Sequence, residues 1–242
     1  MQLNIHAPSL GIGAAIAAVS ILGAFFVLVL DTSESDNPIA KIKLSDTSEK
    51  QIKENDTIAL SLFSAKSTSL LGSQDAPITL VEFGDYQCFY CNRFFHETEP
   101  EIVKNYVDTG KVKIIFKDFT IIGQDSMNAA HASHCANEEG KFWEYHDVLY
   151  NHWTGENNGW ASSGNLHEFA RQIGLDENAF DDCMSSGRYE SVIGQSNSDA
   201  RTLGITGTPA FFVIGPNNVI VKIGGAQPYE VFEKIFESQL KK

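Results

Sequence analysis

Apolar and polar positions divide the chain into three parts. Residues 1–30 contain no Lys, Arg, Asp or Glu, and residues 10–30 are continuous Leu, Ile, Val, Phe, Ala and Gly with one Ser. Residues 31–69 are polar and lack strong periodicity, whereas residues 70–242 alternate short apolar runs with helical patterns. We therefore expect an N-terminal membrane anchor (1–30), a polar tether (31–69) and one folded domain (70–242).

The apolar segment is long enough to cross a bilayer. At ~1.5 Å per residue it spans about 31 Å as a helix. No Lys or Arg precedes it and no small-residue cleavage site ends it, which favours an uncleaved single-pass anchor over a cleaved signal peptide or a buried core helix. Lys41, Lys43, Lys50 and Lys53 follow the segment and oppose an outward-facing domain, but this charge rule weakens for long translocated domains. We expect the folded domain to lie outside the cytoplasm.

The folded domain has the pattern of an α/β protein. Strands are expected at 78–83 and 112–116, with a helix over 92–106 between them, which predicts a βαβ unit with a parallel strand pair. The following residues, about 118–202, are helical in pattern and form an insertion. Its expected helices are 125–139, 142–152, 166–173, 177–185 and 189–203. A hairpin (210–214 and 219–223) and a last helix (229–240) complete the domain.

Two cysteines lie where the first expected strand meets the first expected helix. Cys88-Phe89-Tyr90-Cys91 places Cys88 at the helix N-terminus, where free N–H groups and the helix dipole stabilise a thiolate. Cys88 is therefore the expected nucleophile and Cys91 the buried resolving partner. The alternative is half of a zinc site, but the other two cysteines, Cys135 and Cys183, are 48 positions apart and form no second close pair. We expect no bound metal.

A second motif lies far downstream, at Gly207-Thr208-Pro209, immediately before an apolar run. Proline cannot donate to a sheet, so the step from Thr208 to Pro209 predicts a strand that begins at a special, cis peptide bond. This motif accompanies the Cys88 motif, the preceding Asp85-Tyr86-Gln87, the strand at 78–83 and the segment at 140–147. Through these features together, the chain resembles a DsbA-type member of the thioredoxin superfamily over about residues 70–242. The resemblance implies a thioredoxin-like fold with a helical insertion.

The resemblance also implies roles for individual residues. Cys88 and Cys91 would form the redox-active disulfide, Pro209 would be the cis-proline packed against it, and the backbone of Thr208 would pair with an extended substrate. Glu82 matches the family's buried carboxylate, which relays protons to the resolving cysteine; the alternative is a strand residue pointing to water. Phe89 and Tyr90 would contact substrate.

The dipeptide between the cysteines departs from the best-known family member. Phe89 and Tyr90 replace a proline and a histidine and supply no positive charge to the thiolate. The net redox direction therefore stays open between oxidase and reductase or isomerase.

Cys135 and Cys183 lie in two segments with helical pattern and could be joined. A bridge would link two helices of the insertion and would suit an oxidising compartment, whereas two free buried thiols would behave as small apolar residues. We favour the structural disulfide.

Charge and the remaining motifs narrow the function. The net charge of −13 argues against nucleic acid. Clustered histidines (His131, His134, His146 and His152) are expected to be structural. The sequence thus predicts a monomeric, membrane-anchored thiol-disulfide oxidoreductase without a cofactor that acts on cysteine-containing exported proteins. The resemblance implies that a membrane redox partner recycles it. Less favoured alternatives are a copper-delivery protein, with His96 as the nearest further ligand, and a redox-inert chaperone.

Overall fold

The structure is a computed structural model that describes residues 69–241. The expected anchor (1–30) and nearly all of the expected tether (31–69) lie outside these residues. Between residues 69 and 241, none of the helices combines the length and the apolar character that a membrane crossing requires.

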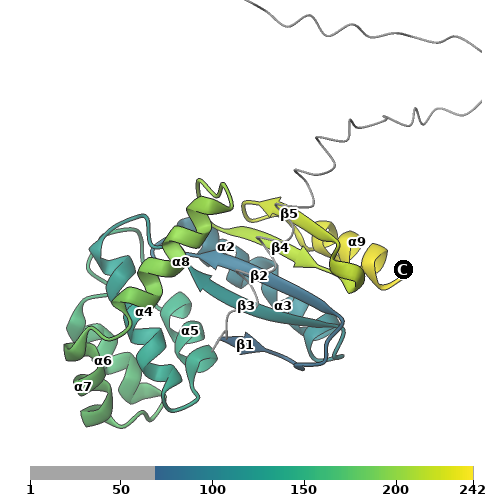
Figure 1. The fold of residues 1–242 in the computed structure, drawn as a ribbon. Coiled ribbons are helices and arrows are strands. Elements are labelled where there is room, and N and C mark those ends of the chain that lie inside the picture. The colour runs from purple at the N-terminus through teal and green to yellow at the C-terminus, as the bar shows by residue number, and fades with distance from the viewer. Residues whose placement is uncertain (1–68, 242) are drawn as a thin grey trace, which may run out of the picture. The chain divides into compact units, whose positions relative to one another are not determined.

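A five-stranded mixed sheet forms the centre of the domain (Figure 1). Its strand order is β1 (Leu70–Leu71), β3 (Val112–Asp118), β2 (Ile78–Gly84), β4 (Ala210–Ile214) and β5 (Ile220–Gly224). β2 pairs in parallel with β3 and antiparallel with β4. The expected βαβ unit and hairpin are therefore present, and the strand that leads to the two cysteines is the central one.

Helices cover both faces of the sheet (Figure 1). Ile78 and Leu80 of β2 pack on one face with Phe94 of α2 (Phe89–Glu97) and Phe232 of α9 (Tyr229–Leu240). The alternate side chains of β2 pack on the other face with α8 (Glu190–Thr202). Since side chains of a strand alternate between faces, Glu82 lies on the same face as Ile78 and Leu80, toward α2.

The helical insertion comprises α4 to α8. Its other helices are α4 (Gln124–Asn137), α5 (Phe142–Asn151), α6 (Ser163–Gln172) and α7 (Glu177–Ser186). The hydrophobic cluster at its centre also contains Cys88 and Cys91. The two cysteines therefore lie where the insertion meets the sheet.

The segment after the cysteines differs from the single helix expected over 92–106. Helix α2 already begins at Phe89 and ends at Glu97; α3 (Glu99–Ile102) and a π-helical turn, η1 (Val103–Val107), follow. Pro100 lies in the first turn of α3, the position where the missing N–H of proline disrupts no helical hydrogen bond. β1 was not expected, and the turn before β5 is a short 3₁₀ helix, η2 (Pro216–Asn218). The other expected elements agree with the structure to within three residues at each end.

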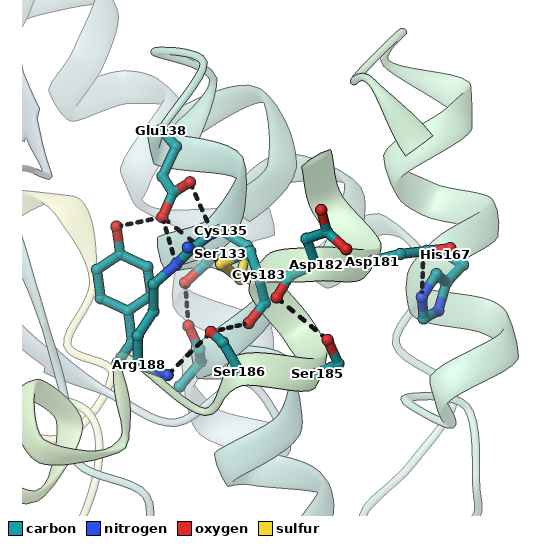
Figure 2. The surroundings of a disulfide bond; sticks show 12 residues. Ser133, Cys135, Glu138, His167, Asp181, Asp182, Cys183, Ser185, Ser186 and Arg188 are labelled. Atoms are coloured by element: carbon teal, nitrogen blue, oxygen red, sulfur yellow. Dashed lines mark hydrogen bonds and ion pairs between the residues drawn. A yellow bond between two sulfur atoms is a disulfide. The ribbon is translucent and has the colours of Figure 1, made fainter. Parts of the chain in front are cut away.

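A disulfide joins two helices of the insertion (Figure 2). Cys135 of α4 and Cys183 of α7 have Cα atoms 5.7 Å apart. Beside them, Glu138 pairs with Arg188 at 2.8 Å and accepts a 2.8 Å hydrogen bond from the Tyr189 hydroxyl. The bridge and this carboxylate therefore fix α4 against α7 and the segment that leads to α8.

Candidate active site

Cys88 is the N-cap of α2 and comes four residues after the end of the central strand. The backbone N–H of Cys91 donates to its Sγ at 3.4 Å. Cys91 itself is fully buried in the first turn, whereas Phe89 and Tyr90 between them are half exposed. The spacing thus places one sulfur at the end of the helix and the other behind it.

The loop before β4 completes the surroundings of Cys88. The Thr208–Pro209 peptide bond is cis, and the Cys88 thiol donates a 3.4 Å hydrogen bond to the Thr208 carbonyl oxygen. Pro209 is buried, and its carbonyl accepts from the N–H of Gly225 at 2.8 Å. The loop is thus tied to the end of β5 on one side and to Cys88 on the other.

The two thiols have opposite acidities. Donation from the Cys91 thiol lowers the pKa of Cys88 most; burial raises it, but the Thr208 side chain and the N–H groups of Cys91 and Tyr90 lower it further, to about 7. The pKa of Cys91 is raised, first by burial and then by its neighbour Cys88. Near neutral pH, Cys88 is therefore about half thiolate while Cys91 keeps its proton, as a nucleophile and its resolving partner require.

Glu82 is 3% exposed, so the interpretation of a strand residue pointing to water is wrong. Its pKa is raised well above the usual value, chiefly by burial and then by the charges of Glu99 and Cys88. The Glu82 charge in turn raises the pKa of Cys91. A carboxyl group whose pKa is raised by burial thus lies within electrostatic reach of both sulfurs.

Glu99 of α3 is a second buried carboxylate, and no motif in the sequence marked it. It is 6% exposed, and its pKa is raised to about 8, first by burial and then by the charge of Asp147. Glu99 and Asp147 both line a surface pocket of about 470 Å³. Glu99 therefore connects the electrostatic surroundings of Glu82 to an opening at the surface.

Two polar residues just before Cys88 hold the surrounding loops. Asp85 accepts hydrogen bonds from the backbone N–H groups of Gln87 (2.9 Å), Ile121 (2.8 Å) and Ile122 (3.1 Å). Burial raises the pKa of Asp85 although these N–H groups oppose the shift. Asp85 therefore joins the end of β2 to the loop that follows β3.

Gln87 is fully buried and holds the loop between α5 and α6. Its carbonyl accepts from the indole N–H of Trp153 at 2.9 Å, and its side-chain oxygen accepts from the N–H of Asn157 at 2.8 Å. Between these two contacts, the Glu156 carboxylate accepts from the N–H of Phe89 at 3.1 Å. Asp85 and Gln87 belong to the motif that carried the resemblance, but nothing in the sequence marked Glu156.

Apolar side chains are exposed beside the sulfur. Phe89 is 48% exposed, Tyr90 52% and Ile121 42%. The ring of Phe89 lies 5.9 Å from Trp153, and the Arg93 guanidinium lies 5.0 Å from the centre of the Tyr90 ring. Large apolar groups at the surface mark interaction sites more often than single exposed residues do.

Other candidate ligands do not come together as a metal site. Among residues 69–241, one set of three has ligand atoms within 4.8 Å of one another: His131, Cys135 and Cys183. Both of its sulfurs are in the disulfide, so they are not the thiolates that zinc binds. His96 does not form such a set with Cys88 and Cys91. His134 pairs with the Asp118 carboxylate at 2.7 Å, a contact that the sequence pattern did not predict.

This geometry is that of a thiol–disulfide exchange centre, and comparison with known proteins agrees. The family model described as thioredoxin matches residues 64–237. The chain belongs to the thioredoxin family. Within it, the chain is similar to the Bacillus subtilis disulfide bond formation protein D, with 28% identity over 181 residues, 74% of this chain and 79% of the relative.

Solved structures place the chain with the DsbA-like members of the family. The oxidised form of Bacillus subtilis BdbD matches with a TM-score of 0.65 and 28% identity over 72% of this chain and 92% of that one. Wolbachia pipientis α-DsbA1 matches with a TM-score of 0.67 and 26% identity over 75% and 94%. The chain is thus a DsbA-like protein-disulfide oxidoreductase with a thioredoxin-like α/β fold.

Proposed function

We propose that this DsbA-like protein introduces or exchanges disulfides in cysteine-containing exported proteins through Cys88 and Cys91. One observation carries the proposal: the N–H of Cys91 in the first turn of α2 donates to the Cys88 sulfur, whose pKa is lowered to about 7, while the pKa of the buried Cys91 is raised. A sulfur that is stabilised as a thiolate beside a thiol that keeps its proton is the asymmetry that directional exchange needs.

The oxidase direction has two steps. A substrate thiolate attacks the Cys88 Sγ of the Cys88–Cys91 disulfide, a mixed disulfide forms at Cys88, and Cys91 leaves as a thiolate. A second substrate thiolate then attacks the substrate sulfur of the mixed disulfide, and Cys88 leaves as a thiolate. The substrate loses two electrons and the enzyme gains them, so a separate oxidant must restore the disulfide.

Buried carboxyl groups supply the proton that Cys91 needs. A thiolate at the fully buried Cys91 is unfavourable because burial disfavours charge. Burial raises the pKa of Glu82 and so favours its protonated form, which can give a proton to the Cys91 sulfur in the first step. The Glu82 carboxylate can take a proton back from the Cys91 thiol when that thiol resolves a mixed disulfide. Glu99 and the pocket beside it offer the route by which Glu82 exchanges that proton with water.

Substrate binding follows from the surface beside Cys88. The backbone at Thr208 and Pro209 lies just before β4 and beside Cys88, where it could pair with an extended cysteine-containing segment, and Phe89 and Tyr90 supply apolar contact area. Backbone pairing and apolar contact both accept many substrate sequences. Broad selectivity for exposed cysteines in unfolded chains is therefore the preference that we propose.

The proposed location is the outer face of a membrane. The apolar residues 10–30 would anchor the chain, residues 31–69 would hold the enzyme away from the bilayer, and a membrane redox partner would reoxidise it. The chain would act as a monomer, because a single copy contains both sulfurs and the Thr208 loop.

A reductase is the second candidate function. The pKa of Cys88, about 7, favours it, since that value is close to thioredoxin's (about 7) and far above DsbA's (about 3.5). A thiolate that is less stabilised makes the reduced enzyme less stable and the disulfide less oxidising.

The test offers the full chain two substrates: a reduced model protein with paired cysteines, and the same protein with its disulfide formed. The proposal predicts that the oxidised enzyme forms the disulfide in a Cys88-dependent reaction. Net reduction by the reduced enzyme would favour the reductase, and a Cys88→Ser variant with undiminished activity would support the chaperone instead. Stoichiometric copper binding to the reduced protein would favour the copper-delivery alternative.

A further inference from the structure

The first N–H of helix α2 does not point at the reactive sulfur. The N–H groups of Tyr90 and Cys91 lower the pKa of Cys88, but the N–H of Phe89 donates to the Glu156 carboxylate at 3.1 Å. Helix α2 has no acidic residue of its own in its first turn. The carboxylate at this helix end comes from a loop that lies more than sixty positions away in the chain.

Glu156 is held at this position by the residues around it. Trp153 and Asn157, on its two sides, both bond Gln87, the residue immediately before Cys88. Asn157 adopts a left-handed φ of 51° and Gly155 a φ of 138°, a tight backbone path that turns the loop at Glu156. The hydrogen bonds of Trp153 and Asn157 and the turns at Gly155 and Asn157 therefore hold the backbone of Glu156 beside the start of α2.

A carboxylate and a thiolate compete at a helix N-terminus. The partial positive charge there stabilises either anion, but two anions at one helix end repel each other. With the Cys88–Cys91 disulfide formed, only the Glu156 charge is present and its bond to Phe89 is favourable. When the disulfide is reduced, the Cys88 thiolate must share the helix end with Glu156.

We propose that Glu156 is a positioning residue that sets the redox poise of the Cys88–Cys91 pair, by favouring the disulfide over the thiolate form. This inference rests on the proposed function. On this inference, Glu156 makes the Cys88–Cys91 disulfide a weaker oxidant.

Other ionisable groups face Cys88 from the elements packed around it. They are Glu82 on β2, Cys91 on α2 and Tyr150 on α5, each coupled electrostatically to the Cys88 sulfur. All three are buried and are unchanged by substitution in the exposed loop. The Glu156 contribution can therefore be isolated by changing its charge alone.

The experiment compares Glu156→Gln and Glu156→Lys with the wild-type full chain. The amide oxygen of Gln keeps an acceptor for the Phe89 N–H while it removes the charge. Glu177→Gln is the matched control, because Glu177 is an exposed carboxylate in the first turn of α7.

For each protein, the pKa of Cys88 is measured from the pH profile of its alkylation rate. The reduction potential of the Cys88–Cys91 pair is measured from its equilibrium with glutathione at pH 8. In that reaction, two glutathione thiols reduce the disulfide and become one glutathione disulfide.

Glu156→Gln is expected to lower the pKa of Cys88 by about 0.5, and Glu156→Lys by about 1. At pH 8 the Gln substitution then shifts the glutathione equilibrium about threefold toward the reduced enzyme, ~14 mV at about 29.6 mV per tenfold. The shift should shrink in about 1 M salt, since Glu156 is exposed. Unchanged values in both variants, or equal shifts in Glu177→Gln, would overturn the inference while leaving the proposed function intact. A wild-type protein without any reversible couple would overturn both.

Discussion

The sulfur of Cys88 lies 3.4 Å from the carbonyl oxygen of Thr208, a residue 120 positions later in the chain. This contact joins the start of α2 to the loop before β4, two segments whose strands are neighbours in the sheet. Under the proposed function, a substrate that paired with the backbone at Thr208 would be held beside the reactive sulfur. The proposed substrate-binding surface and the proposed nucleophile therefore adjoin each other, and each can be tested separately.

Replacing each cysteine of the active pair should give opposite results. Cys88→Ser should abolish disulfide exchange because no nucleophile remains. Cys91→Ser should accumulate a mixed disulfide between Cys88 and substrate, because the thiol that releases unproductive adducts is missing. Non-reducing electrophoresis followed by mass spectrometry checks both. Adducts at Cys135 or Cys183 in place of Cys88 would contradict the assignment.

Removing the Cys135–Cys183 disulfide should lower the unfolding free energy but leave the rate of disulfide exchange unchanged. The bridge between Cys135 and Cys183 closes a loop with a sequence separation of 48, and loss of such a link typically lowers the unfolding free energy by about 2–4 kcal/mol. The Cys135→Ala, Cys183→Ala double variant is measured by urea unfolding and by the rate of disulfide exchange at a temperature where it is folded. A large loss of exchange rate in the folded variant would show that the pair takes part in the reaction.

Phe89 and Tyr90 should contribute to substrate affinity. Replacing both by Ser removes two half-exposed aromatic rings beside Cys88 while leaving the backbone N–H groups of the helix in place. We expect the KM for a cysteine-containing peptide to rise about tenfold, the equivalent of roughly 1.4 kcal/mol, with the pKa of Cys88 nearly unchanged. Ile121→Ser is a comparison at the edge of the same surface. An unaltered KM in the double variant would remove these rings from the binding surface.

Glu99 should make the folded protein less stable as pH rises. Its pKa in the folded state is about 8, above the usual value, so the folded state holds a proton that the unfolded chain releases. A raised carboxyl pKa gives stability that is present below the unfolded pKa and is lost as pH rises through the folded one. The unfolding free energy should therefore fall by up to about 1.4 kcal/mol per pH unit between about pH 5 and 8.

The variant Glu99→Gln checks this pH dependence. A neutral amide replaces the protonated carboxyl group, so the decline in stability should flatten and the variant should exceed the wild type above pH 8. Glu82→Gln gives a second comparison, since its pKa is raised by the same kind of burial. An identical decline in wild type and Glu99→Gln would mean that other groups account for it.

Local sequence features predicted the parts of the site that local rules govern. The spacing of Cys88 and Cys91 after an apolar run was enough to place both sulfurs at a helix N-terminus, because strand, turn and helix signals are all short-range. Resemblance to a family supplied Thr208 and Pro209, which no local rule links to Cys88. The break after Glu97 was missed because the apolar pattern continues through it, although Pro100 offered a signal.

Other residues of the site could not be found from the sequence. Glu99 and Glu156 are ordinary carboxylates in pattern, and only the fold brings them to Glu82 and to the N–H of Phe89. The pairing of His134 with Asp118 is concealed for the same reason. Burial and long-range hydrogen bonds determine these roles, and the spacing of residues in the sequence predicts neither.

The most direct test of the central claim is the reduction potential of the full chain, purified in mild detergent and equilibrated with glutathione buffers, with the redox state of each cysteine mapped by mass spectrometry. The account predicts one reversible two-electron transition at Cys88–Cys91, between about −270 mV and about −120 mV, while Cys135–Cys183 stays oxidised. A transition confined to Cys135–Cys183, or no reversible transition at Cys88–Cys91, would contradict it.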